Sequence, residues 1–278
     1  MSSRSHSRIK GRFAELKQQG RKALIPYLTA GDPEPAFTVP LMHAMVAAGA
    51  DILELGVPFS DPMAEGPVIQ HAMERALERH VSLQDVIGMV KTFREKDGET
   101  PVLLMGYLNP LEVTGYAKFV SQAVEAGIDG VLIVDLPPEE ATELTGFAKD
   151  RLDIVFLVAP TTTDQRIEHI AQSSTGFVYY VSLKGVTGAG NLDTAQVIEK
   201  VQKIKQHTDL PVGVGFGIKD ANTAKKIAAV ADAVIVGSAL VKLVEANRAS
   251  QDDAILAVSD LITSMRKGMD ADSTSSAA

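Results

Sequence analysis

The chain has 278 residues, of which 45% are hydrophobic and 22% charged, a composition typical of a globular protein that can bury a full core. A formal net charge of -8 argues against a broad basic surface for nucleic acid, and the absence of cysteine excludes disulfides, thiolate metal sites and cysteine nucleophiles. No apolar run approaches the roughly 18 residues that span a bilayer, and the serine-rich N-terminus lacks the apolar segment of a secretory signal. We expect a cytoplasmic protein without a nucleic-acid or membrane partner.

Short apolar runs alternate with amphipathic helical segments along the chain. An opening helix is predicted because Ile9, Phe13 and Leu16 fall on one helical face. Helices are also predicted within 37–50 and 116–127, which run into glycines near their ends. Near-continuous Val, Ile and Leu runs are typical of parallel strands covered on both faces. The predicted strands are 23–29, 51–57, 101–107, 130–136, 153–159, 177–183, 211–216 and 233–237.

Eight strand–helix units without a long linker predict an α/β fold, a (β/α)8 TIM barrel, with a doubly wound open sheet as the alternative. We expect one domain over residues 1–268, with the extra N-terminal helix, and a disordered, flexible C-terminal tail over 269–278. In such barrels the chemistry lies at the carboxyl ends of the strands. The polar residues and glycines at or near predicted strand ends are Glu54, Tyr107, Asp135, Tyr179, Gly217 and Gly237.

A pair of carboxylates is predicted near the end of the second strand. Glu54 lies within an apolar run, where burial would raise its pKa toward the range that suits a proton donor. The following loop carries Ser60, Asp61 and Glu65 among three prolines that stiffen it, so a second carboxylate can face the first. The alternatives are a structural, hydrogen-bonded Glu54 and solvated loop charges at Asp61 and Glu65.

Late glycines indicate a phosphate site. Gly217 follows the seventh strand and Gly237 the eighth, the places where barrels commonly hold a phosphate. Ser238 is expected to cap the helix that starts there and to bind the anion. The glycine-flanked segment 184–188 suits a mobile lid. The alternative is that these glycines form ordinary turns without a ligand.

Several motifs together indicate a known family. They are PYLTAGDP at 26–33, LELGVPFSDPMAEGPVIQ at 53–70, YLNP at 107–110, VDLP at 134–137, GVTG at 185–188, GFGI at 215–218 and VGSALVK at 236–242. On these motifs the chain resembles the tryptophan synthase alpha subunit over nearly its whole length. The resemblance implies a lyase of tryptophan biosynthesis, which splits indole-3-glycerol phosphate into indole and glyceraldehyde 3-phosphate without a Schiff base, a metal or a cofactor on this chain.

The resemblance also implies roles for single residues. Glu54 would act at indole C3, as proton donor and then base, and Glu65 would accept a bond from the indole N–H. The family commonly has aspartate at position 65, so this chain departs from it by one methylene. Asp61 would meet the lid on closure. The residues expected to bind substrate or its phosphate are Tyr27, Tyr107, Tyr179, Thr187, Gly188, Gly217, Gly237 and Ser238.

A partner is implied as well. The family docks on a pyridoxal-phosphate-dependent beta subunit, giving an αββα heterotetramer, through the prolines around 58–62 and the loop near Asn109 and Pro110. Three alternatives remain open: a stand-alone lyase with the same residues, a non-catalytic regulatory subunit favoured only by the exchange at Glu65, and a Schiff-base aldolase. The last would need Lys184, the only lysine near a predicted strand end.

Overall fold

The computed structural model describes residues 7–181, 194–215 and 217–271, and its strands form a single parallel sheet. The strand order is β5-β4-β3-β2-β1-β9-β8-β7-β6. The strands are β1 (Ala23–Thr29), β2 (Leu53–Gly56), β3 (Val102–Gly106), β4 (Gly130–Ile133), β5 (Asp153–Ile154), β6 (Leu157–Val158), β7 (Val178–Val181), β8 (Val212–Gly215) and β9 (Ala233–Val236).

The two ends of this sheet meet in one continuous segment. β5 pairs with β4 and β6 pairs with β7, and only Val155 and Phe156 separate β5 from β6. The N–H of Val155 donates to the carbonyl of Val131 (3.0 Å), whereas the carbonyl of Phe156 accepts from the N–H of Tyr179 (3.2 Å). Residues 153–158 therefore act as one barrel strand, and the sheet closes. The (β/α)8 barrel is confirmed, and the open-sheet alternative is wrong.

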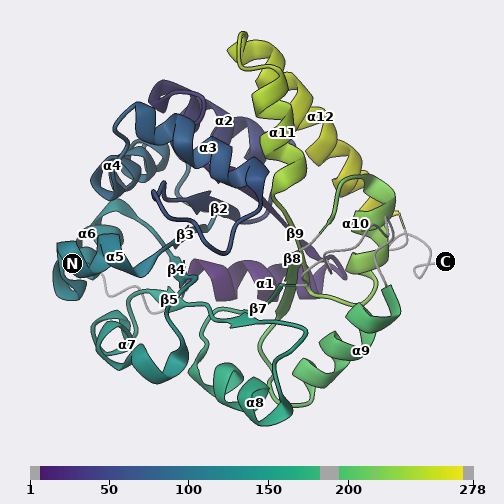
Figure 1. The fold of residues 1–278 in the computed structure, drawn as a ribbon. Helices are drawn as coiled ribbons and strands as arrows, with labels where there is room; N and C mark the ends of the chain where they lie inside the picture. Colours follow the sequence, from purple (N-terminus) through teal and green to yellow (C-terminus); the bar gives the residue numbers. More distant parts are fainter. Residues whose placement is uncertain (1–6, 182–193, 216, 272–278) are drawn as a thin grey trace.

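Helices form a ring outside the barrel (Figure 1). They are α2 (Pro35–Ala47), α3 (Pro67–Glu78), α4 (Leu83–Arg94), α5 (Leu108–Thr114), α6 (Tyr116–Ala126), the 3-10 turn η1 (Pro138–Glu140), α7 (Thr142–Ala148), α8 (Asp164–Ser173), α9 (Thr194–Lys205), α10 (Ala221–Ala228), α11 (Ser238–Ala246) and α12 (Gln251–Asp270). Within the described chain, no helix is long and apolar enough to cross a membrane. Residues 269 and 270, assigned to the tail by the sequence, belong to α12, and residues 272–278 lie outside the described residues.

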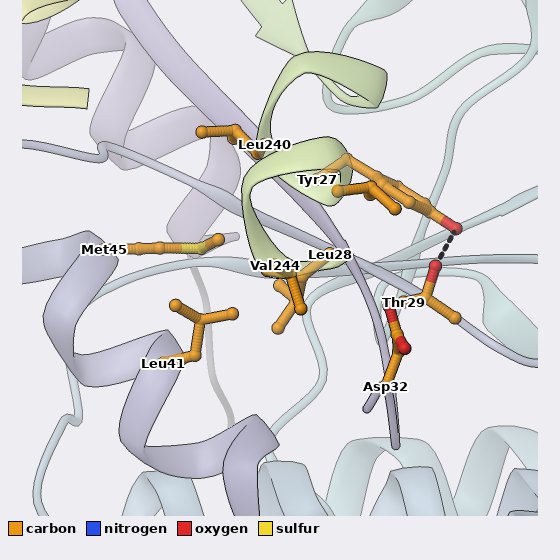
Figure 2. Close-up of a pocket in the computed structure, with 9 residues that line it drawn as sticks. Tyr27, Leu28, Thr29, Asp32, Leu41, Met45, Leu240 and Val244 are labelled. Carbon is orange, nitrogen blue, oxygen red and sulfur yellow. Dashed lines mark hydrogen bonds between the residues drawn. The ribbon is translucent and has the colours of Figure 1, made fainter. Parts of the chain in front are cut away.

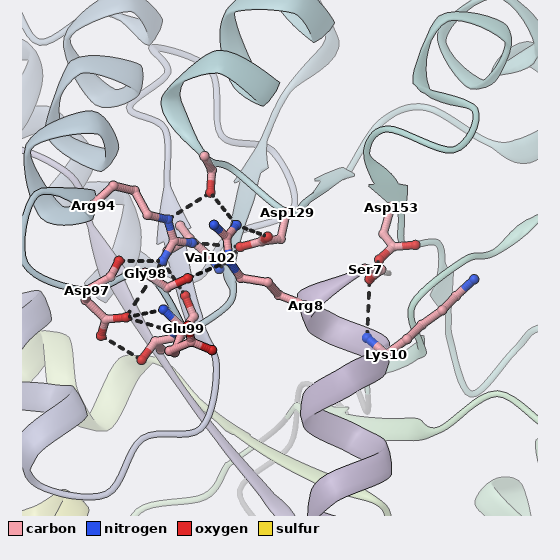
Figure 3. A network of polar contacts seen from close by, with 12 residues as sticks. Ser7, Arg8, Lys10, Arg94, Asp97, Gly98, Glu99, Val102, Asp129 and Asp153 are labelled. Carbon is pink, nitrogen blue, oxygen red and sulfur yellow. Dashed lines mark hydrogen bonds and ion pairs between the residues drawn. The ribbon is translucent and has the colours of Figure 1, made fainter. Parts of the chain in front are cut away.

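The predicted opening helix is α1 (Arg8–Gln18), which lies across the amino-terminal end of the barrel (Figure 1). Its apolar face, Ile9, Phe13 and Leu16, packs on the innermost side chains of the barrel. Arg8 fixes it further through a salt bridge to Asp129 (2.6 Å), and Arg94 contacts the same carboxylate (2.7 Å; Figure 3). The helix thus closes the floor of the barrel and leaves the carboxyl end as the mouth.

Two apolar layers result from the alternation of side chains along each strand. One layer, between strands and outer helices, forms the largest core cluster. The inner layer fills the barrel above α1 with Ile25, Ile52, Leu103, Leu132, Val155, Phe177, Tyr179, Ala233 and Ile235. The packed lower half leaves the carboxyl ends of the strands as the place where polar side chains can gather.

Candidate active site

Glu54 is a buried carboxyl inside the barrel mouth. It lies on β2, paired in register with Tyr27 of β1 and Leu103 of β3, and only 1% of its surface is exposed. Among the described residues, neither carboxyl oxygen has a hydrogen-bond partner. Burial, reinforced by the nearby Glu65, raises its pKa from 4.5 to about 8. At neutral pH the group is therefore protonated and free to donate.

Glu65 lies on the loop between β2 and α3. Its N–H donates to the carbonyl of Pro62 (3.0 Å), which closes a turn. The residue is half-buried, and its Oε1 is buried without a partner among the described residues. Burial raises its pKa from 4.5 to about 7, below that of Glu54. Glu65 consequently ionises first, and its negative charge holds the proton on Glu54.

Two buried tyrosines, Tyr27 and Tyr179, lie near the two glutamates. The hydroxyl of Tyr27 lies over Gly56, where a Cβ atom would come within 2.1 Å of it, and shares a hydrogen bond with Thr29 (3.1 Å; Figure 2). The hydroxyl of Tyr179 lies over Gly215 in the same way, at 2.4 Å. Burial raises both tyrosine pKa values, and the charges of the two glutamates raise them further. Both rings therefore lie close to both carboxyls.

Tyr107 lies directly after β3 and is also buried. Its ring stacks on Phe59 with 5.1 Å between centroids, and its hydroxyl accepts a hydrogen bond from the N–H of Ala64 (3.1 Å). Burial raises the pKa of Tyr107 from 10 to about 12. The hydrogen bond from Ala64 lowers this pKa, and the charge of Glu65 raises it. Tyr107 thus contacts the loop that carries Glu65.

The residues predicted to bind phosphate lie at the expected strand ends, with one correction. Gly217 follows β8 and adopts a positive φ of 53°, a conformation that favours glycine. Ser238 was expected to cap α11, but it is the first residue inside the helix, and Gly237 holds the cap position without a side-chain bond. The reason is that β9 ends at Val236 and leaves a single residue before the helix. The helix still begins directly after the carboxyl end of β9, so its first-turn N–H groups lie next to that strand end.

Other predicted residues are placed apart or lie beyond the described chain. Asp61 is exposed in the loop and accepts a hydrogen bond from Ser60 (2.6 Å). Thr187, Gly188 and Lys184 lie outside the described residues. Within the described ranges, no lysine is among the buried charged side chains, and no group of three His, Asp or Glu residues could hold a metal ion.

The residues that make room for the site were not predicted from the sequence. Gly56 and Gly215 leave space for the two tyrosine hydroxyls, and Thr29 bonds one of them. The sequence did contain one indication of this space: Gly56 lies inside a strand, two positions after the isolated Glu54, and glycine in a strand often marks a close approach of another group. Behind β1, a cavity of about 10 Å³ lies beside Thr29 and Asp32 (Figure 2) and is too small for a substrate.

A closed parallel barrel with a buried and a half-buried glutamate at its mouth, and with glycines after its last two strands, has the architecture of a (β/α)8-barrel enzyme. The model of the tryptophan synthase alpha chain family matches residues 13–270. The chain therefore belongs to this family, whose members are lyase subunits.

Individual relatives agree with this assignment. The chain is 61% identical to the tryptophan synthase alpha chain of Thioalkalivibrio sulfidiphilus over 95% of its length and 100% of the relative's. It is 60% identical to that of Nitrosococcus oceani, over 95% and 98%. The crystal structure of the alpha subunit from Legionella pneumophila superposes with a TM-score of 0.90 at 47% identity, covering 96% of this chain and 99% of the other.

Proposed function

We propose that Glu54 and Glu65 together carry out the family's reaction, the cleavage of indole-3-glycerol phosphate to indole and glyceraldehyde 3-phosphate. The observation that carries this proposal is the burial of Glu54 in the mouth with both carboxyl oxygens unbonded among the described residues. A buried polar group without a partner costs stability and is kept where a ligand uses it. The burial of Glu65 beside it favours catalysis over a purely regulatory subunit.

The two carboxyls divide the chemistry by their protonation. Neutral Glu54 donates its proton to indole C3, which interrupts the aromatic ring and makes it an electron sink. Ionised Glu65 accepts the bond from the indole N–H. Glu54, now a carboxylate, takes the proton of the glycerol C3′ hydroxyl. The bond between C3 and C3′ then breaks, its electrons restore the indole ring, and C3′ becomes the aldehyde carbon.

The far end of the substrate would be anchored by backbone groups. The N-terminus of α11 offers the N–H groups of Gly237 and Ser238, and a helix N-terminus favours an anion. Gly217, after β8, would add a further N–H donor. A Cβ at Gly237 would meet Tyr27 at 3.7 Å and Ile69 at 3.8 Å, so this position lies against the ring proposed to hold the indole. The buried faces of Tyr27 and Tyr179 would hold the indole between the phosphate and the carboxyls.

The test is Glu54→Gln, which keeps the shape and removes the transferable proton. We expect cleavage of indole-3-glycerol phosphate, followed as indole release, to fall by at least about 100-fold. Circular dichroism should show an unchanged fold. Turnover equal to the parent's in a folded Glu54→Gln protein would refute the mechanism.

We propose that the chain assembles with a pyridoxal-phosphate-dependent beta subunit as αββα and itself carries no cofactor. Support comes from the mouth-side elements that the family resemblance assigned to docking. Met63, beside the loop prolines, and Val113, on α5 with Asn109 and Pro110, are each 83% exposed. Exposed large apolar side chains near one rim are a signature of an interaction surface. A cytoplasmic location remains a prediction.

Assembly is tested by mixing the chain with a beta subunit of the family. Light scattering measures the mass of the complex, and an activity assay measures the rate of indole release. We expect a complex of two chains of each kind and faster cleavage. Val113→Asp should weaken association and leave the basal cleavage of the isolated chain unchanged. High activity that does not respond to any beta subunit would instead favour a stand-alone lyase.

A further inference from the structure

The turn that carries Glu65 is held from the barrel side by Tyr107. The phenol oxygen accepts the N–H of Ala64, the residue directly before Glu65, at 3.1 Å. Tyr107 itself is 2% exposed, and its ring stacks on Phe59 of the same loop with an interplanar angle of 22°. Both ring and hydroxyl therefore bind the loop, and the hydroxyl fixes the backbone next to the catalytic carboxyl.

The same turn is held from the helix side by Gln70. Its side-chain amide donates to the backbone carbonyl of Glu65 at 2.8 Å. Gln70 lies in the first turn of α3, so the bond ties Glu65 to the start of that helix.

Helix α3 is anchored in turn by Arg75. The guanidinium bonds both carboxylate oxygens of the buried Asp32, at 2.7 and 3.0 Å, and the carboxylate of Glu245 at 3.0 Å. These contacts join α3 to the end of β1 and to α11. A two-bond arginine–carboxylate contact fixes orientation as well as distance. The frame to which Gln70 attaches is therefore itself rigid.

We propose that Tyr107 and Gln70 are positioning residues that act through Glu65, and that Tyr107 is not the substrate-binding residue the sequence suggested. The proposal rests on the catalytic role proposed for Glu65. A glutamate side chain has several rotatable bonds, so its carboxyl is held in one place only if the backbone that carries it is fixed. A displacement of about 1 Å at a reacting group costs about 100-fold in rate.

Tyr107→Phe tests the hydroxyl alone, because the ring and its stacking on Phe59 remain. We expect kcat for indole release to fall by about 10-fold, the effect of one hydrogen bond, while KM changes less than about 2-fold. A looser turn should expose Glu65 and lower its pKa. The acidic limb of the pH profile of kcat should therefore move to lower pH. Gln70→Met should act alike. Tyr116→Phe, which removes from α6 a hydroxyl bonded to Glu112 of α5, is the matched control and should have no effect.

Two measurements separate positioning from substrate contact. In a Glu65→Ala background Tyr107→Phe should cause no further loss of kcat, whereas a direct contact would cost the same factor again. Binding of indole-3-propanol phosphate by calorimetry should keep its Kd within about 2-fold in Tyr107→Phe. A full second loss in the double variant, or a Kd weakened as much as kcat/KM, would overturn the proposal. Full activity of Glu65→Ala alone would refute the role of Glu65 instead.

Discussion

The buried carboxyl of Glu54 makes stability depend on pH in a direction opposite to that of a salt-bridged acid. Its pKa is about 8 in the folded chain against 4.5 when solvated. Between these values the folded state holds a proton that the unfolded state has released, so rising pH favours unfolding. Full stability is present below pH 4.5 and is lost as the pH approaches 8. At about 1.4 kcal/mol per unit, the contribution is about 5 kcal/mol at most.

Glu54→Gln removes this titration and keeps the volume. We therefore expect the difference in free energy of unfolding, variant minus parent, to increase by up to about 5 kcal/mol as the pH rises from 4.5 to 8. Urea unfolding followed by circular dichroism at closely spaced pH values measures the difference. Glu78→Gln, on the exposed end of α3, is the control and should run parallel to the parent. Parallel curves for Glu54→Gln would show that the carboxyl is not buried in the neutral form.

Four further outcomes are expected. The rate of cleavage should be bell-shaped in pH, lost below about 7 as Glu65 takes up a proton and above about 8 as Glu54 loses one; a flat profile from pH 6 to 9 would contradict the assignment. Glu65→Asp should retain most activity and Glu65→Ala should lose about 100-fold in kcat, and equal rates would assign the residue to solvent. Gly237→Val should raise KM about 10-fold with little change in kcat, and an unchanged KM would place the phosphate elsewhere. Asp129→Ala should lower the free energy of unfolding by about 3–5 kcal/mol because two arginines lose their carboxylate, as thermal melts would show; an unchanged melting temperature would argue against it.

Much of the barrel was predictable because each strand is buried on both faces. Such strands must be almost wholly apolar, so their runs are visible in the sequence, and an isolated acid such as Glu54 is visible within one. The face of α1 was predictable for the same reason, since Ile9, Phe13 and Leu16 repeat at helical spacing.

What the sequence left open depends on contacts between distant residues. The break between β5 and β6 follows from the way residues 153–158 pair with different neighbours on their two sides. The fit of Tyr179 over Gly215 and the bond from Gln70 to Glu65 depend on side-chain geometry that no periodicity encodes. The capping role of Ser238 was wrong by one position, an error typical of helix boundaries predicted from residue preference.

The closed floor of the barrel limits the route by which substrate enters and products leave. With α1 and its Arg8–Asp129 link sealing one end, and the inner apolar layer filling the space above it, substrate and both products share the opposite opening. The exposed Met63 and Val113 lie on the segments that follow β2 and β3 at this end of the barrel. A protein bound there would receive the apolar, uncharged product as it is released, before that product could diffuse into bulk water.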